Sequence, residues 1–390
     1  MPWREASAMD QRLEFISDYL RHLWSMSDLC TRYGISRPTG YKWVGRYKAE
    51  GPAGLVDRSR RPHHSPNATD PEAVEALLAE RRRHPRWGGK KLLPLLHARN
   101  PDLALPAVST AELILKRHGL VESRRRRPRR RVAVPARTES TAPNEVWTAD
   151  FKGEFRTRDG RYCYPLTIVD DYSRYLLACC ALLKPTAAAT RATFGRLFRR
   201  LGLPRVIRTD NGTPFAGKGL ARLSRLAVWW IELGISPELI APARPEQNGR
   251  HERLHRTLKE ATALPPAGSA RAQQRRFDRF REEYNRERPH EALGQVVPES
   301  VYEPSPRAWP EPLSPVDYPG HFELRRVGRD GCIKWHSQRV FVSFVLQAQR
   351  IGLEELTPGA WDVYFGPRRL GVFVEAERRI EDVSILTPLS

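Results

Sequence analysis

The chain has 390 residues and a formal net charge of +21 at pH 7, and 40% of its residues are hydrophobic. Single hydrophobic cores rarely grow beyond about 250–300 residues, so we expect several domains. No apolar run is long enough to span a bilayer, and the five cysteines form no CxxC pair. These features exclude an integral membrane protein and a disulfide-rich secreted domain, and they predict a cytoplasmic protein with reduced thiols. The positive charge favours a polyanionic partner, most simply nucleic acid.

Residues 1–60 have the spacing of three short helices. Ser27 and Ser36 are suited to cap the second and third helices, and Gly34 provides the turn between them. An ordinary three-helix bundle would fit this spacing too, but the polar and basic third helix favours a helix-turn-helix DNA-binding domain. The DNA-contacting residues predicted on that helix are Arg37, Thr39, Tyr41, Lys42 and Arg46.

Residues 70–123 predict a second, winged-helix-like DNA-binding domain with helices near 72–83, 88–99 and 108–118. Ser109 is placed to cap the last of these helices, which Gly119 would end. A basic linker, residues 124–144, follows. Its arginines are expected to lie along DNA phosphates, although a merely solvated linker is the alternative. They are Arg124, Arg125, Arg126, Arg127, Arg129, Arg130 and Arg131.

Residues 145–303 change to strands followed by alternating helices and strands. Strands are expected at 146–152, 162–170, 174–183 and 205–209, and helices at 186–201, 218–233, 248–262 and 270–286. This order predicts a mixed α/β sheet flanked by helices. After a proline-rich linker, short strand-like runs in residues 318–390 predict a small β-barrel. The protein is therefore expected to be multidomain, with all-α N-terminal modules, a central α/β domain and a C-terminal β domain.

Three acidic residues stand in positions suited to metal chemistry. Asp150 ends an apolar strand, Asp210 closes another strand before an Asn-Gly turn, and Glu252 lies near the start of an expected helix. Three converging carboxylates can hold two Mg²⁺ ions, which activate an attacking oxygen and stabilise a leaving oxygen in phosphodiester chemistry. Each aspartate taken alone is also consistent with an ordinary surface residue at a strand end.

Four segments of the central domain carry a family resemblance: Trp147–Phe151, Thr209–Phe215, Arg244–Arg253 and Tyr284–Leu293. Together they resemble the catalytic core of bacterial insertion-sequence transposases, the DDE enzymes of the retroviral integrase superfamily, whose core has a ribonuclease H-like fold. The helix-turn-helix and the basic linker also resemble the end-binding region of that family. The His-His-Cys-Cys zinc module of retroviral integrases is missing from this sequence.

Two glutamates compete for the role of third metal ligand. Glu246 lies 36 positions beyond Asp210, the interval usual in retroviral-type integrases, whereas Glu252 lies 42 positions beyond it. Glu246 follows a proline in an expected loop, while Glu252 has a rigid helical platform. The resemblance also favours Glu252, because the family's ligand is the glutamate after Asn-Gly-x-x. We therefore predict Asp150, Asp210 and Glu252 as the catalytic and metal-binding residues.

The resemblance implies a polynucleotidyl transferase that uses two Mg²⁺ ions, for which Mn²⁺ can substitute. It implies a transposase that binds the ends of a mobile element, cleaves their 3′ ends and transfers the strands into target DNA. The expected partners are double-stranded DNA and further copies of the chain, as a dimer or tetramer on the bacterial nucleoid. Additional DNA contacts are predicted beside Glu252, at Arg250, Arg253, Arg256 and Lys259.

Two alternatives concern the same residues. His251-Glu252-Arg253-Leu254-His255 matches the HExxH signature of zinc peptidases, in which both histidines bind zinc and the glutamate acts as base. That motif is short and its neighbours are basic, so we interpret the histidines as DNA contacts or helix-surface residues. The other alternative is a non-catalytic DNA-binding protein that keeps the core as a scaffold. Asp170 and Asp171 are expected to accept local hydrogen bonds within a turn.

Overall fold

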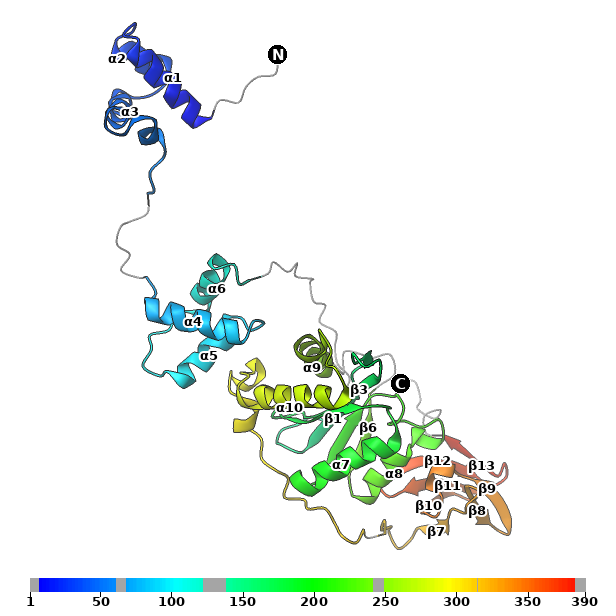
Figure 1. Ribbon diagram of the computed structural model, residues 1–390. Helices are drawn as coiled ribbons and strands as arrows, with labels where there is room; N and C mark the ends of the chain where they lie inside the picture. The colour runs from blue at the N-terminus through cyan, green and yellow to red at the C-terminus, as the bar shows by residue number, and fades with distance from the viewer. Residues whose placement is uncertain (1–6, 61–67, 122–137, 241–248, 314, 383–390) are drawn as a thin grey trace. The chain divides into compact units, whose positions relative to one another are not determined.

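The computed structural model describes residues 7–60, 68–121, 138–240, 249–313 and 315–382. The chain divides into two compact units, residues 1–68 and 69–390. Figure 1 shows their helices and strands. Within the described ranges, no helix is long and apolar enough to cross a membrane.

The N-terminal unit is built from α1 (Ala8–Leu20), α2 (Met26–Arg32), α3 (Arg37–Glu50) and the short helix η1 (Gly51–Leu55). Phe15, Leu29 and Trp43 contribute to its hydrophobic core. The side chain of Ser25, and not of the predicted Ser27, caps α2 by accepting a hydrogen bond from the backbone N–H of Asp28. Gly34 has the left-handed φ of +64° that a turn between α2 and α3 requires. The order of helix, turn and helix agrees with the prediction.

The second unit begins with α4 (Pro71–Arg83), α5 (Gly89–Arg99) and α6 (Val108–Arg117), which pack around Leu77, Leu92 and Leu115. The prediction that Ser109 caps the last helix was wrong. Helix α6 begins one residue earlier, after Ala107, and has no side-chain cap. The predicted wing and the arginines of the linker lie outside the described residues.

The central domain contains a six-stranded mixed sheet. Its strands are β1 (Val146–Phe151), β2 (Phe155–Arg156), β3 (Tyr162–Asp170), β4 (Leu176–Leu182), β5 (Val206–Thr209) and β6 (Ser236–Leu239). The order is β2-β3-β1-β5-β6, with β4 paired to β3. Strand β3 is antiparallel to β1 and β4, whereas β5 runs parallel to β1 and β6. The parallel pair brings the carboxyl ends of β1 and β5 to the same edge of the sheet.

Helices cover both faces of this sheet (Figure 1). Trp147 and Ile207 pack on one face with α7 (Ala187–Leu201) and α8 (Arg225–Glu232). Val169 and Cys179 pack on the other face with α9 (Gly249–Leu258) and α10 (Ala270–Arg286). Successive strand residues point to opposite faces, so the residues that alternate with Trp147 and Ile207 point toward α9 and α10.

Two details of the central domain differ from the prediction. The expected helix at 218–233 is interrupted: a short 3-10 turn, Leu220–Arg222, precedes α8, which Ser224 caps. Strand β6 was not predicted, because it is only four residues long, contains Pro237 and lacks an apolar–polar alternation. Its position is decided by parallel pairing with β5, which is a tertiary contact.

Side-chain amides of α10 form hydrogen bonds with the backbone of β4, which is at the edge of the sheet. The backbone N–H of Leu176 donates to Asn285 Oδ1 at 2.8 Å, and Asn285 Nδ2 donates to the Leu176 carbonyl at 3.1 Å. Gln274 repeats this pattern: Ala181 N–H donates to its Oε1 at 2.7 Å, and its Nε2 donates to the Cys179 carbonyl at 2.9 Å. The helix thus satisfies backbone groups that an open sheet edge would leave unpaired.

We expect Asn285→Ala to lower the free energy of unfolding of the central domain by about 2–6 kcal/mol, because it leaves two buried backbone groups of Leu176 without these partners, at about 1–3 kcal/mol each. Urea denaturation followed by tryptophan fluorescence measures the change. Arg279→Ala, at an exposed position of the same helix, is the matched control and should change stability by less than about 0.5 kcal/mol. Equal stability of the two variants would contradict this role for Asn285.

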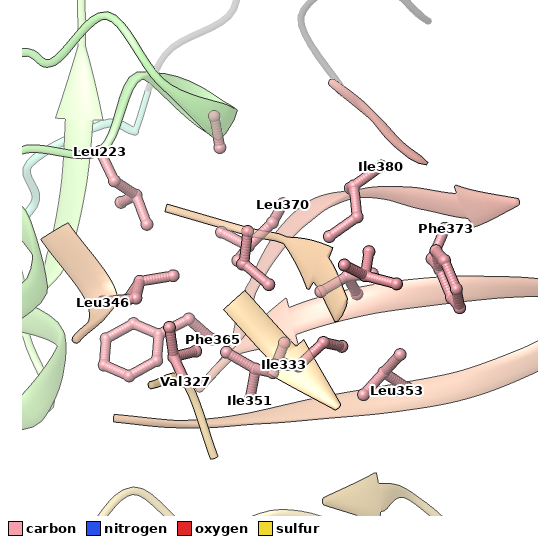
Figure 2. Close-up of a cluster of buried hydrophobic side chains, with 14 of the residues drawn as sticks. Leu223, Val327, Ile333, Leu346, Ile351, Leu353, Phe365, Leu370, Phe373 and Ile380 are labelled. Carbon is pink, nitrogen blue, oxygen red and sulfur yellow. The ribbon is translucent and has the colours of Figure 1, made fainter. Parts of the chain in front are cut away.

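The C-terminal domain is an open antiparallel sheet with a hairpin packed against it. The sheet consists of β7 (Glu323–Arg326), β10 (Arg350–Thr357), β11 (Ala360–Phe365), β12 (Arg368–Val374) and β13 (Arg379–Asp382), and the hairpin of β8 (Cys332–Trp335) and β9 (Gln338–Phe341). Figure 2 shows Ile333 of the hairpin in one core with Leu353 and Phe365 of the sheet and Leu223, which precedes α8. Among residues 315–382 the strands do not close into the predicted barrel, because the hairpin pairs only with itself.

Candidate active site at the carboxyl ends of two parallel strands

Asp150 and Asp210 lie at the carboxyl ends of the adjacent parallel strands β1 and β5. In the parallel register of β1 and β5, Ala149 lies opposite Thr209, so the two aspartates follow at the next level of the same pair. Neighbouring strands lie about 4.8 Å apart. Since Trp147 points toward α7 and α8, the alternation along β1 directs the Asp150 carboxylate toward α9 and α10. Asp210 directly follows the last residue of β5, so the fold places at the ends of neighbouring strands two residues that are 60 positions apart in the sequence.

Asp210 is partly buried, and burial raises the pKa of its carboxyl above the ordinary value. The backbone N–H of Gly212 donates to Asp210 Oδ1 at 3.2 Å and opposes this shift. Asp150 is also largely buried, with 13% of its side chain exposed. Carboxylates held in such an environment are suited to a cation, whose charge would favour the ionised form.

Glu252 lies on α9, the helix that covers this face of the sheet, and its side chain is exposed. In the part of the chain that the structure describes, no three His, Cys, Asp or Glu side chains are grouped closely enough to hold a metal ion. The described geometry thus places the two aspartates at the ends of neighbouring strands but does not assemble the three acids into a metal site. The competing residue Glu246 lies outside the described residues.

The two histidines of the HExxH motif are buried, so their interpretation as DNA contacts or helix-surface residues was wrong. His251 is 3% exposed and His255 is 7% exposed. Burial lowers the pKa of His251 to about 4 and that of His255 to about 3, so both imidazoles are neutral at pH 7. His255 Nε2 lies 2.8 Å from Thr167 Oγ1, and its Nδ1 lies 3.9 Å from Asp150 Oδ2. These residues face the sheet, and no third ligand for a zinc site joins them among the described side chains.

Asp170 and Asp171 have the structural roles expected of them. Asp170 is fully buried and accepts hydrogen bonds from the backbone N–H groups of Asn144 and Ser173. Burial would raise the pKa of Asp171, but nearby arginines outweigh it and hold that pKa below the ordinary value. The arginines are Arg250, Arg174 and Arg208.

The predicted DNA contacts on α9 therefore divide into two kinds. Arg250 Nη1 lies 2.5 Å from Asp171 Oδ1, which ties the start of α9 to the turn after β3. Arg253, Arg256 and Lys259 have exposed side chains near Glu252. These three cations leave their charges available to a phosphate backbone.

The predicted contacts on α3 mostly face solvent. Arg37, Tyr41 and Lys42 are exposed, whereas Thr39 and Arg46 are half-buried. The Arg46 guanidinium and the Lys42 ammonium lie over the ring of Trp43, at 5.1 Å from its centroid in both cases. The predicted arginines of the linker, Arg124–Arg131, lie outside the described residues.

The sequence analysis missed a basic cavity of about 710 Å³ in the C-terminal domain. Its lining includes five cations together with Asp330, which pairs with Arg339 at 2.9 Å. The positive lining suits a polyanion. The signal that could have revealed it is the cluster of arginines around β7. The five cations are Arg325, Arg326, Arg329, Lys334 and Arg339.

Comparison with protein families agrees with this geometry. Residues 140–245 match a model of the integrase core domain, and residues 233–298 match a second model of the same description. The two matches together contain Asp150, Asp210 and Glu252. Residues 10–84 match a model described as the leucine-zipper of insertion element IS481. Residues 140–298 of this chain, which include the central sheet, are therefore similar to integrase core domains.

Individual proteins are similar to parts of this chain. A 31.7 kDa protein of insertion element IS407 from Burkholderia multivorans is 26% identical over 286 residues, which cover 70% of this chain and 92% of that protein. The Gag-Pol polyprotein of baboon endogenous virus is 32% identical over 130 residues, or 33% of this chain and 7% of the polyprotein. The magnesium complex of the HTLV-2 integrase catalytic core (trimeric form) is 16% identical with a TM-score of 0.34, covering 42% of this chain and all of that one. The central domain is thus similar to integrase cores, and most of the chain is similar to a protein of a bacterial insertion element.

Proposed function

We propose that this protein cleaves the 3′ ends of a mobile DNA element and joins them to target DNA. One observation supports the proposal: within the central domain, Asp150 and Asp210 lie at the carboxyl ends of neighbouring parallel strands, and α9 packs on the face of the sheet toward which Asp150 points. Helix α9 bears Glu252 and exposed cations. Acidic oxygens flanked by phosphate-binding cations suit phosphodiester chemistry better than peptide hydrolysis.

The donor set fits a divalent cation. Carboxylate oxygens are the ligands that Mg²⁺ prefers, and Mn²⁺ accepts the same set. The raised pKa of Asp210 reflects a carboxylate whose burial a cation would offset. Two bound Mg²⁺ ions would supply an activated nucleophile and stabilisation of the leaving oxygen. We propose that Asp150 and Asp210 hold the cations, that Glu252 completes the set, and that Arg253, Arg256 and Lys259 orient the phosphate backbone.

Recognition of the element ends is assigned to the N-terminal unit. The exposed face of α3 presents Arg37, Tyr41 and Lys42, as the second helix of a helix-turn-helix does. We propose that this face enters the major groove of the element ends. Because two ends have to be joined in one reaction, we also propose that two or four copies of the chain act together on DNA.

Labelled DNA carrying candidate element ends tests the function directly. We expect 3′-end cleavage with Mg²⁺ and none with EDTA, whereas binding of the ends should persist in EDTA. The double variant Arg37→Glu/Lys42→Glu should weaken binding at low salt, because it reverses two charges on the recognition face. Specific binding without cleavage at any ionic condition would support the non-catalytic alternative. Cleavage that persists in EDTA would contradict the metal-dependent mechanism.

A further inference from the structure

The two histidines of α9 converge on a single residue of the sheet. Thr167 lies on β3 and is fully buried. Its hydroxyl lies 2.8 Å from His255 Nε2, and its backbone interacts electrostatically with the imidazole of His251. The two imidazole rings contact each other edge to face, with centroids 5.3 Å apart. His251 and His255, one turn apart on α9, therefore both contact Thr167 of β3.

Thr167 is also the residue that faces Asp150 across the sheet. The two residues are partners in the antiparallel register of β1 and β3. The Thr167 hydroxyl donates to the Asp150 carbonyl oxygen at 3.2 Å. The same hydroxyl therefore lies within hydrogen-bonding distance of both the Asp150 carbonyl and His255 Nε2. The hydrogen bonds form a continuous path from α9 through Thr167 to the backbone of Asp150.

Glu252 stands between the two ends of this clamp, one residue after His251 and three before His255. A helical turn fixed at both histidines leaves the backbone of Glu252 little freedom to shift relative to Asp150. Such supporting hydrogen bonds orient metal ligands, and their loss typically costs about 10- to 100-fold in metal affinity or activity. The burial of all three clamp residues keeps water from competing for these bonds.

We propose that His251 and His255 are positioning residues that clamp α9 onto Thr167 and so set the placement of Glu252 relative to Asp150. The inference rests on the proposed function, because it assigns these two acids to one metal site. It also gives the HExxH motif a role other than zinc binding: its histidines bind the sheet, and its glutamate serves the DNA-processing site.

Thr167→Val tests the clamp, because it removes the hydroxyl and keeps the volume of the side chain. We expect Mn²⁺ binding to the full-length protein, measured by electron paramagnetic resonance without DNA, to weaken about 10- to 100-fold. Cleavage should require a correspondingly higher Mn²⁺ concentration, while affinity for the element ends stays unchanged. Thr167→Ser, which restores the hydroxyl, should recover both properties to within about threefold. His255→Phe, which keeps a ring of similar size, should act as Thr167→Val does, and the double variant should add little because both changes break one bond.

Thr190→Val is the matched control. Thr190 is fully buried, and its hydroxyl donates to the Thr186 carbonyl at 2.9 Å in α7, on the opposite face of the sheet. This variant should bind Mn²⁺ as the wild type does, whatever its effect on melting temperature. Wild-type Mn²⁺ binding and cleavage in folded Thr167→Val or His255→Phe would overturn the clamp. If Asp210→Asn is inactive in the same assays, the proposed function survives that result; if Asp210→Asn is fully active, the proposed function fails instead.

Discussion

Asp210→Asn is expected to reduce 3′-end cleavage and strand transfer by about 10³-fold or more while leaving DNA binding intact. A carboxylate ligand supplies several kcal/mol of transition-state stabilisation through the metal that it holds, and every 1.4 kcal/mol is about tenfold in rate. Asparagine keeps the size of the side chain and the capacity to accept the Gly212 hydrogen bond. Single-turnover cleavage of labelled element ends measures the rate, and mobility shift in EDTA measures the binding.

Asp159→Asn provides the control for this variant. Asp159 is an exposed aspartate of the same domain, in the turn between β2 and β3, so the substitution removes the same charge away from the strand ends. Its cleavage rate should equal that of the wild type. If Asp210→Asn also cleaved at the wild-type rate, the metal site proposed at the carboxyl ends of β1 and β5 would be wrong.

Glu252→Gln is expected to lower cleavage by about 10³-fold, and Glu246→Gln to leave it within about twofold of the wild type. The reason is geometric: Glu252 is carried by a helix packed on the face of the sheet to which Asp150 belongs. A ligand on such a helix is held in place by the packing of Leu254 and Leu258. Comparing the cleavage rates of the two variants shows which glutamate is the third metal ligand.

The same comparison can refute the assignment. A large loss in Glu246→Gln with an active Glu252→Gln would transfer the third ligand to residue 246 and restore the shorter interval from Asp210. Melting temperature should be unchanged in both variants, because Glu252 is exposed and its removal leaves no buried group without a partner. Calorimetric Mn²⁺ titration of each variant without DNA gives a second readout, independent of turnover.

The HExxH motif shows that a local sequence pattern does not reveal what its histidines contact in the folded domain. Spacing correctly places His251 and His255 on one face of α9, since residues four apart are neighbours on a helix. What that face contacts depends on Thr167, which lies more than 80 positions earlier in the chain. The burial of both rings, and hence their neutral state, could not be read from the motif, because burial is a property of the packed domain.

The helices and longer strands of the central domain were predictable for a local reason. Strands β1 and β3 and helices α7 and α10 have sustained apolar periodicity and clear ends, such as Thr186 at the start of α7 and Gly202 after it. Strands β6 and β8 were missed, since each has four residues and is stabilised chiefly by its pairing. The predicted C-terminal barrel failed similarly, because closure of a sheet depends on pairings that no single segment encodes.

By itself, the sequence determined the strands at whose ends the two aspartates lie and the helix that carries Glu252, and it indicated that the central domain resembles integrase cores. Those features depend on residue type and on spacing within a segment, which local periodicity and turn chemistry fix. Only the tertiary structure decided that the strands before Asp150 and Asp210 pair in parallel, that Arg250 binds Asp171, and that His255 faces Thr167. These relations join residues far apart in the chain, and they arise from the register of the sheet and the packing of α9 on it.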